Sequence, residues 1–142
     1  MSTSFGDFNK GLINDLRSHG GKPTSGPFLG RDVLILTTRG AKSGESRETP
    51  LVYTRDNGHY VIVASKGGAP THPSWYHNIV ANPNLTIEVL GEKIPVKAHI
   101  PDGDEYERLY EQHANINPTF HDYRKRTTRK IPVIVLERGD KG

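Results

Sequence analysis

The sequence contains no cysteine among its 142 residues. Disulfide bonds, thiolate metal sites and cysteine nucleophiles are therefore excluded, and the composition is compatible with a reducing compartment. No apolar run approaches the roughly 20 residues that span a bilayer, and the first residues lack the pattern of a signal peptide. These absences predict a cytoplasmic protein without a transmembrane segment.

Several common catalytic and nucleotide-binding motifs are also missing. Lys42 and Ser43 precede Gly44 rather than follow it, so the P-loop order is not matched. No Gly-x-Gly-x-x-Gly follows a predicted strand, and Gly-x-Ser-x-Gly is absent. His72 and His77 are five residues apart, which would place them about 140° apart on a helix rather than on one face. The sequence therefore gives no support to a P-loop, a dinucleotide fold, a serine hydrolase or a histidine metal site.

The composition fits a turn-rich globular domain. The chain is 33% hydrophobic and 25% charged, and it has 15 glycines and 10 prolines. The net charge of +3 is mild, but the basic residues are clustered at 39–47 and 124–130. Such clusters attract anions, which include phosphates, carboxylates, nucleic acids and lipid headgroups.

The first 30 residues are expected to differ in organisation from residues 31–142. Apolar residues recur at helical spacing within residues 1–19, which predicts a short amphipathic helix; they are Phe5, Phe8, Leu12, Ile13 and Leu16. Residues 20–30 are rich in glycine and proline and should form a linker. The helix is expected to dock on its own domain; the alternative is peripheral contact with a membrane through residues 5–16.

Short strands dominate the chain from Asp32 onward. Six are predicted, and they cover residues 33–37, 50–54, 60–64, 85–89, 94–100 and 131–136. Asn57-Gly58 predicts a tight turn that joins the second and third strands in a hairpin, and Gly91-Glu92 predicts another between the fourth and fifth. Pro95 indicates an edge strand or an N–H position that faces away from the neighbouring strand.

Two helices are predicted between the strands. One should run from about Pro73 to Ala81, where Asn82-Pro83 ends it. The other should begin after Asp102, which forms a capping-box pattern with Glu105, and its apolar face should use Tyr106, Leu109 and Tyr110. The pattern favours an α+β fold, mainly β, in which antiparallel strands form a barrel or a strongly coiled sheet with helices around it.

The most informative segment is the basic loop between the first two strands. Gly40 and Gly44 permit positive φ and close approach of the backbone to a ligand. Consecutive N–H groups in such a loop form a concave anion site. Lys42 and Arg47 add a mobile charge and a bidentate fork, and Ser43 adds a donor. These residues together suit a phosphate or a chain of carboxylates.

A second segment runs from Ala64 to Trp75. A strand ends there in a glycine-rich turn, and a helix begins with the chain's single tryptophan near its start. Small residues leave room for a planar ring, and the N–H groups of the turn and of the helix N-terminus can face its polar edge. Trp75 could form a wall of this pocket or pack in the core.

These segments together resemble the deazaflavin-dependent nitroreductase family, whose members use coenzyme F420. The resemblance runs from about Val33 to Glu137 and rests on several ordered motifs, which are Thr38–Arg47 with Pro50, Ala64–Pro70, His72–Asn78, Ala81–Pro83 and Arg129–Val135. It implies a split β-barrel of the flavin-binding-oxidase type. It also implies hydride transfer from the reduced ring to a quinone or a nitro compound. The acidic phosphate and oligoglutamate tail of the coenzyme would explain why the loop is basic.

The resemblance assigns roles to individual residues. The phosphate end would be held by Lys42, Ser43, Gly44 and Arg47. The ring and its ribityl-like chain would be surrounded by Pro50, Ala64, Ser65, Lys66, Gly67, Ser74 and Trp75. Ser65 and Tyr123 are the candidate catalytic residues, and Phe120 and Tyr123 are the candidate substrate-binding residues. No metal is implied.

The segment 117–123 departs from the family pattern. In the characterised nitroreductase the aligned segment carries three tyrosines on the substrate side, whereas this chain has Asn117, Phe120 and Tyr123. The loss of two of the three tyrosines is compatible with quinone reduction, but it predicts low activity on bulky nitroaromatic compounds.

Three other interpretations remain open from the residues. They are a flavin-mononucleotide-binding reductase or oxidase on the same barrel, a coenzyme carrier without enzymatic activity, and a nucleic-acid-binding module. The last requires aromatic residues interleaved with the basic ones, and residues 39–47 contain none.

The charge of Lys66 is expected to stabilise the negative edge of the ring together with the N–H groups near it. The Lys66→Met variant should therefore bind the coenzyme more weakly or turn over more slowly. Titration of wild type and variant with the coenzyme, followed by a reductase assay, measures both effects. An unchanged enzyme would remove Lys66 from this scheme.

Overall fold

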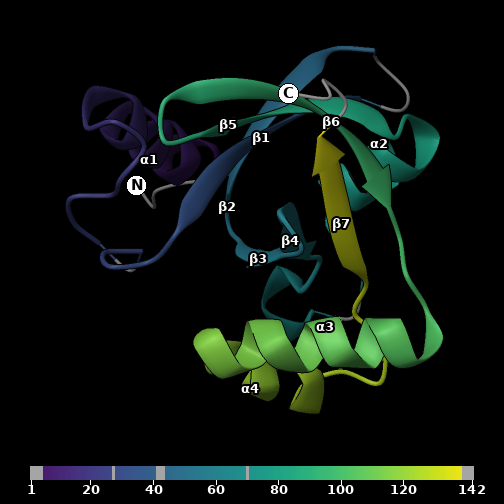
Figure 1. The fold of residues 1–142 in the computed structure, drawn as a ribbon. Helices are drawn as coiled ribbons and strands as arrows, with labels where there is room; N and C mark the ends of the chain where they lie inside the picture. Colours follow the sequence, from purple (N-terminus) through teal and green to yellow (C-terminus); the bar gives the residue numbers. More distant parts are fainter. Residues whose placement is uncertain (1–4, 27, 41–43, 70, 139–142) are drawn as a thin grey trace.

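A computed structural model describes residues 5–26, 28–40, 44–69 and 71–138 of the chain. A single curved sheet forms its centre, and all neighbouring strands in it are antiparallel, in the order β2-β1-β5-β6-β7-β4-β3 (Figure 1). The strands are β1 (Val33–Arg39), β2 (Ser46–Val52), β3 (Thr54–Asp56), β4 (His59–Val63), β5 (Asn84–Val89), β6 (Glu92–His99) and β7 (Val133–Arg138). The predicted split-barrel class is confirmed, with seven described strands rather than about six.

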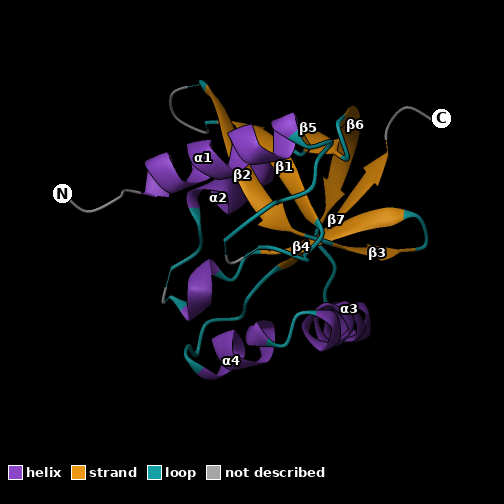
Figure 2. Ribbon diagram, turned by 90° about the vertical axis from the view of Figure 1, so that its left-hand side faces the viewer, coloured by secondary structure: helices purple, strands orange, loops and turns teal. Residues whose placement is uncertain are grey.

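Helices lie around the sheet (Figure 2). They are α1 (Phe5–Ser18), the single 3₁₀ turn η1 (Lys66–Gly68), α2 (Ser74–Ala81), α3 (Gly103–Ile116) and α4 (Thr119–Lys125). The predicted helices at the N-terminus, at 73–81 and after Asp102 are confirmed. Neither η1 nor α4 was predicted; α4 has only seven residues, and none of its side chains is fully buried, so it has little periodic apolar pattern to detect.

The predicted strand at 50–54 is wrong in its pairing. Its first part belongs to β2, which pairs with β1 from Arg39↔Ser46 to Val33↔Val52. The ladder ends where β1 begins, and the Tyr53 N–H then donates to Asp32 O. Only the following strand, β3, forms the predicted hairpin with β4. Asn57 and Gly58 in its turn have φ values of 50° and 82°, as a two-residue turn with positive φ requires.

Two further expectations need correction. In the β5–β6 hairpin the positive-φ residues are Leu90 and Gly91, and Glu92 already pairs with Val89. Pro95 lies in β6, which is an interior strand, so the edge alternative is wrong. It pairs with Thr86 of β5, three pairs along from the Val89↔Glu92 pair that closes the hairpin. Because hydrogen-bonded and non-hydrogen-bonded pairs alternate in an antiparallel ladder, the ring nitrogen faces away from β5, as the other alternative requires.

The capping box after Asp102 is not formed. Asp102 is the N-cap residue of α3 and has an extended backbone, but its side chain makes no capping hydrogen bond. Glu105 reaches His99 instead, with 3.6 Å between Oε1 and Nε2. The predicted apolar face of α3 is confirmed, because Tyr106, Leu109 and Tyr110 are buried against β4 and β7.

The two faces of β1 pack against different partners. Val33 and Ile35 lie under α1, against Leu12, Ile13 and Leu16, whereas Leu34 and Leu36 belong to the main core that also contains Trp75 and Ile79 of α2. This alternation follows from the period of two along a strand. The expected docking of the first helix on its own domain is therefore observed for its described side chains. In the described residues no helix has the length and apolar character to cross a membrane.

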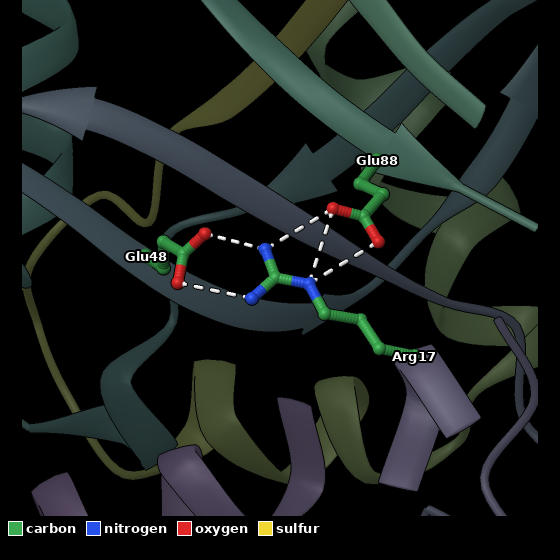
Figure 3. A network of polar contacts seen from close by, with 3 residues as sticks. All are labelled: Arg17, Glu48 and Glu88. Atoms are coloured by element: carbon green, nitrogen blue, oxygen red, sulfur yellow. Dashed lines mark hydrogen bonds and ion pairs between the residues drawn. The ribbon is translucent and has the colours of Figure 1, made fainter. Parts of the chain in front are cut away.

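Arg17 fastens α1 to two strands at once (Figure 3). Its guanidinium forms ion pairs with Glu48 of β2 and Glu88 of β5, the second at 3.1 Å. The hydrogen bonds that Arg17 donates to Glu48 and Glu88 raise the pKa of its side chain above the ordinary value. Because β1 lies between β2 and β5, the same contact fixes α1 across three strands.

His113 of α3 is the most deeply buried titratable group described. It is 0% exposed; its Nδ1 lies 3.0 Å from Thr54 Oγ1, and its Nε2 has no hydrogen-bond partner in the described part of the chain. Its ring also packs edge-on against Phe120, with 4.5 Å between centroids. Burial lowers the pKa of His113 to about 4, so the ring is neutral in the folded protein near pH 7.

This burial predicts a loss of stability in mild acid. Between pH 6.5 and pH 4 the unfolded chain takes up a proton at His113 that the folded chain does not, so the free energy of unfolding must fall as the pH falls. The expected loss from this residue is about 2 kcal/mol between pH 7 and pH 5. The His113→Asn variant keeps a polar side-chain atom near Thr54, but its amide does not take up a proton in this pH range. Urea unfolding at both pH values should show a smaller decrease in the variant; equal decreases would contradict the assignment.

Candidate functional site

The glycine-rich segment after β4 forms a compact turn. Gly68 N–H donates to Ser65 O at 2.9 Å, and Ala69 N–H donates to Lys66 O at 3.1 Å. Lys66 has a φ of 48° and Gly68 a φ of 83°, so the chain reverses direction through two left-handed residues. Ser65 is 8% exposed, whereas the Lys66 side chain is exposed and donates to Thr71 Oγ1 at 3.2 Å.

Arg129 binds the backbone of this turn. Its Nε donates to Ala69 O at 3.0 Å, its Nη1 to Ala64 O at 3.2 Å and its Nη2 to Ser65 O at 2.8 Å. Burial lowers the pKa of Arg129 from its ordinary value, and nearby Tyr106 and Tyr110 act in the opposite direction. In the sequence Arg129 is only one member of a basic cluster. Arg129 also begins the Arg129–Val135 motif, but its contacts are 57 to 65 residues away along the chain, so no local pattern shows which groups it binds.

His72 completes the support of the turn. Its Nδ1 lies 2.8 Å from Arg129 Nη1, and because a guanidinium can only donate, Nδ1 must be the acceptor. Burial lowers the pKa of His72, and the charges of Arg129 and His77 add to this shift. His72 is therefore a neutral acceptor near pH 7, and the described residues contain no group of three or more ligands that could hold a metal ion with it.

The candidate catalytic residues come from segments in direct contact. A Cβ built on Gly68 would lie 2.9 Å from both Tyr123 O and Arg126 Cβ, so the turn packs closely against α4. The rings of Phe120 and Tyr123 are 5.1 Å apart, edge to face. The structure thus brings the Ser65 turn beside the α4 segment that carries the candidate substrate-binding residues.

Asn117 does not lie on that surface. It is 3% exposed, and its Oδ1 accepts a hydrogen bond from Arg31 Nη1 at 2.8 Å. At this position of the family pattern the chain therefore has a residue that joins the end of α3 to Arg31, just before β1. The aromatic groups that remain near the turn are Phe120 and Tyr123.

The ring-site residues on α2 lie at its N-terminal end. Ser74 is exposed, whereas Trp75 is 8% exposed and packs in the main core together with Ala64. Asn78, one helical turn later, donates to Thr38 Oγ1 at 3.2 Å. Because Thr38 directly precedes the basic loop, α2 joins the glycine-rich turn at one end to the basic loop near its other end.

The described part of the basic loop is a tight, exposed reversal. Gly40 N–H donates to Glu45 O at 2.7 Å, Gly44 N–H donates to Gly40 O at 2.8 Å, and Gly44 has a φ of 74°. Arg39 Nη1 donates to Gly44 O at 3.2 Å. Arg47 is exposed and lies 3.7 Å from Glu45. The candidate phosphate ligands Lys42 and Ser43 lie outside the described residues.

Register separates two of the predicted ligands. Arg47 pairs with Thr38, and cross-strand partners share a face of the sheet, so Arg47 lies on the α2 face. Pro50 pairs with Ile35, which packs under α1. The structure therefore places the Pro50 side chain on the face opposite Trp75, and the other predicted ring residues are grouped without it.

Two open hollows lie elsewhere on the described surface. One of about 540 Å³ is lined by Gly103, Asp104, Tyr106, Glu107, Arg124, Arg129, Lys130 and Ile131, and one of about 240 Å³ is lined mainly by residues 21–23 and 30–33. In the larger hollow Arg124 is already paired with Glu107 at 2.8 Å. Volume alone would point to these hollows, but the groups that suit a planar anion are those of the turn and the loop.

Comparison with known proteins gives consistent matches. The model of the F420H(2)-dependent quinone reductase family matches residues 12–138. The chain is 46% identical over 114 residues to an F420H(2)-dependent quinone reductase of Mycobacterium tuberculosis strain H37Rv, covering 74% of this chain and 72% of the relative. A solved F420-H2 dependent reductase matches with a TM-score of 0.69 and 40% identity over 75% of this chain and 95% of that chain. A solved structure described as a domain-swapped dimer matches with a TM-score of 0.71 and 36% identity, over 90% and 93%.

The close packing of Gly68 predicts a cost for any side chain there. Gly68→Ala would force a left-handed residue, at about 1–2 kcal/mol, and press a methyl group into the backbone of α4, at about 1–3 kcal/mol more. Gly58→Ala is the matched control, because Gly58 has a similar φ of 82° and nothing within 4 Å of the added Cβ. Urea unfolding should show the larger loss in Gly68→Ala; equal losses would mean that the turn does not pack on α4.

Proposed function

Because the chain belongs to the F420H(2)-dependent quinone reductase family, we propose that it uses reduced coenzyme F420 to reduce a quinone. The coenzyme supplies the hydride, and the protein supplies binding, orientation and electrostatics. The observation that carries the proposal is the arrangement around α2, which joins a glycine-rich turn beside aromatic residues to a basic loop. The turn suits the planar ring of the coenzyme, and the basic loop suits its acidic tail.

The residues of the turn fit a planar redox ring. Ala64 at the start of the turn shares the main core with Trp75 of α2, and Gly68 near its end packs against α4, which carries Phe120 and Tyr123. We assign the ring contacts to Ala64, Ser65, Lys66, Gly67, Ser74 and Trp75. Pro50 remains in the proposed set through its backbone only, because its register places its side chain on the face of the sheet opposite Trp75.

The basic loop fits the acidic tail. Arg39 and Arg47 flank a reversal whose described residues are exposed, and a phosphate or carboxylate can displace the weak surface pair between Arg47 and Glu45. We assign the phosphate end to Lys42, Ser43, Gly44 and Arg47. Such charge-assisted hydrogen bonds are stronger than neutral ones and favour Arg where two oxygens are bound together.

The acceptor is proposed to enter over α4. Tyr123 is half-buried and packs edge-on against Phe120, so a flat quinone ring can contact their exposed edges. We propose that the hydroxyl groups of Ser65 and Tyr123 hold the acceptor oxygen that receives a proton. Nitro compounds are a second acceptor class, for which an aromatic surface reduced to Phe120 and Tyr123 predicts slower turnover.

A direct experiment tests the enzymatic proposal. Purified protein with reduced F420 and a soluble quinone should oxidise the coenzyme, as measured by the return of its absorbance, and a nitroaromatic acceptor should react more slowly. Binding of F420 without quinone reduction would indicate a coenzyme carrier. Binding and turnover with flavin mononucleotide in place of F420 would favour the flavin alternative.

Charge removal from the basic loop tests how the tail is held. The double variant Lys42→Gln with Arg47→Gln should bind F420 about 10- to 100-fold more weakly at low salt, because one or two charge-assisted hydrogen bonds are lost. The matched control is Lys93→Gln with Lys97→Gln, two exposed lysines of β6, which should leave the affinity unchanged. Tryptophan quenching measures both; equal affinities of the two double variants would remove the loop from the site.

A further inference from the structure

We propose that Arg129 is a positioning residue that aims the 64–69 turn at the coenzyme ring. By holding the carbonyl groups of Ala64 and Ser65, it presents the N–H groups of Ser65 and Lys66 to the negatively charged edge of the ring. This inference rests on the proposed function and adds to it a residue that does not itself touch the coenzyme.

The first step is the convergence of carbonyl groups on one guanidinium. Three carbonyl oxygens from a six-residue segment accept hydrogen bonds from Arg129 at 2.8–3.2 Å, each from a different nitrogen atom. A lysine could not reproduce this set, because its three N–H bonds radiate from a single atom. Arg129 therefore fixes the orientation of the peptide planes as well as their position.

The second step follows from peptide geometry. The described peptide bonds are all trans, and in a trans peptide the N–H points away from the C=O of the same plane. Since the carbonyl groups of Ala64 and Ser65 point toward Arg129, the N–H groups of Ser65 and Lys66 point away from it. Among the described backbone hydrogen bonds outside helices and strands, neither N–H donates to an oxygen, and the proposal assigns both to an acceptor on the ring.

The third step is electrostatic. A positive charge behind a carbonyl group polarises its peptide and strengthens the N–H on the other side. When the reduced deazaflavin ring loses its N1 proton, the negative charge is localised on the pyrimidine edge, whereas in the oxidised anion it is spread over the conjugated ring. Polarised donors should thus favour the reduced form. His72 holds the guanidinium in place through Nη1, and its own lowered pKa keeps it an acceptor near pH 7.

Lys66 is less suited to this role by position. Its side chain is exposed and donates to Thr71 Oγ1 within the same segment. Arg129 is half-buried, and its contacts hold the backbone itself. The structure therefore assigns the organisation of the donors to Arg129, and the charge of Lys66 acts in addition to it.

The experiment compares Arg129→Gln and Arg129→Lys with wild type for both redox forms of the coenzyme. Affinities for F420 and, without oxygen, for reduced F420 are measured by quenching of Trp75. We expect Arg129→Gln to lose at least tenfold in affinity for the reduced form and less for the oxidised form. Arg129→Lys should lose nearly as much, and added ethylguanidinium should restore part of the affinity of Arg129→Gln.

Lys130→Gln is the matched control. It removes the same charge one residue away, and its ammonium group lies 4.4 Å above the Tyr106 ring rather than on the turn. Its affinities for both forms should stay within twofold of wild type. A merely structural role of Arg129 would weaken both redox forms equally, without rescue, and that result would overturn the inference, as would unchanged affinities.

The two proposals can fail separately. If wild-type protein binds neither redox form of F420, the proposed function is refuted. If wild type binds F420 and Arg129→Gln binds both forms as wild type does, only the role of Arg129 is refuted.

Discussion

The pairing of β4 with β7 is the constraint on which the candidate site depends. It runs from Tyr60↔Leu136 to Val63↔Val133 and extends by one more hydrogen bond, from Ala64 N–H to Pro132 O. The segment that follows β4 and the segment that precedes β7 therefore lie side by side where they meet the sheet. The first becomes the glycine-rich turn and the second carries Arg129, so a long-range strand pairing brings the guanidinium to the carbonyl groups that it binds.

The features predicted correctly from the sequence are those encoded within a few residues. Asn57-Gly58 specifies its own turn because both residues tolerate positive φ, and the apolar spacing of 12–16 specifies the face of α1 that is buried. The errors concern competition between partners. Residues 50–52 could pair with the strand before them or with the strand after them. They pair with β1, which is long enough to continue the ladder through Val52. Asp102 and Glu105 had the capping pattern, but Glu105 was drawn to His99, which no local pattern reveals.

In the candidate site, too, local features could be predicted from the sequence and long-range contacts could not. The basic loop and the glycine-rich turn were visible as motifs because each is a continuous segment. The support of the turn by Arg129, the packing of Gly68 on α4 and the use of Asn117 to bind Arg31 join residues that are far apart in sequence. Residues that belong to a continuous motif can thus be predicted from the sequence, whereas the residues that orient them are brought together only by the topology of the sheet.

The exposure of the loop between β1 and β2 has a consequence for coenzyme diversity. Gly44, Glu45 and Arg47 lie at the outer surface, so an acidic tail bound there, as proposed, would extend into solvent rather than end in a closed cavity. Additional glutamates would extend into water, where they neither clash with the protein nor gain further contacts. The protein would then accept coenzyme molecules with short and long polyglutamate chains almost equally, and selection for chain length would have to come from elsewhere in the cell.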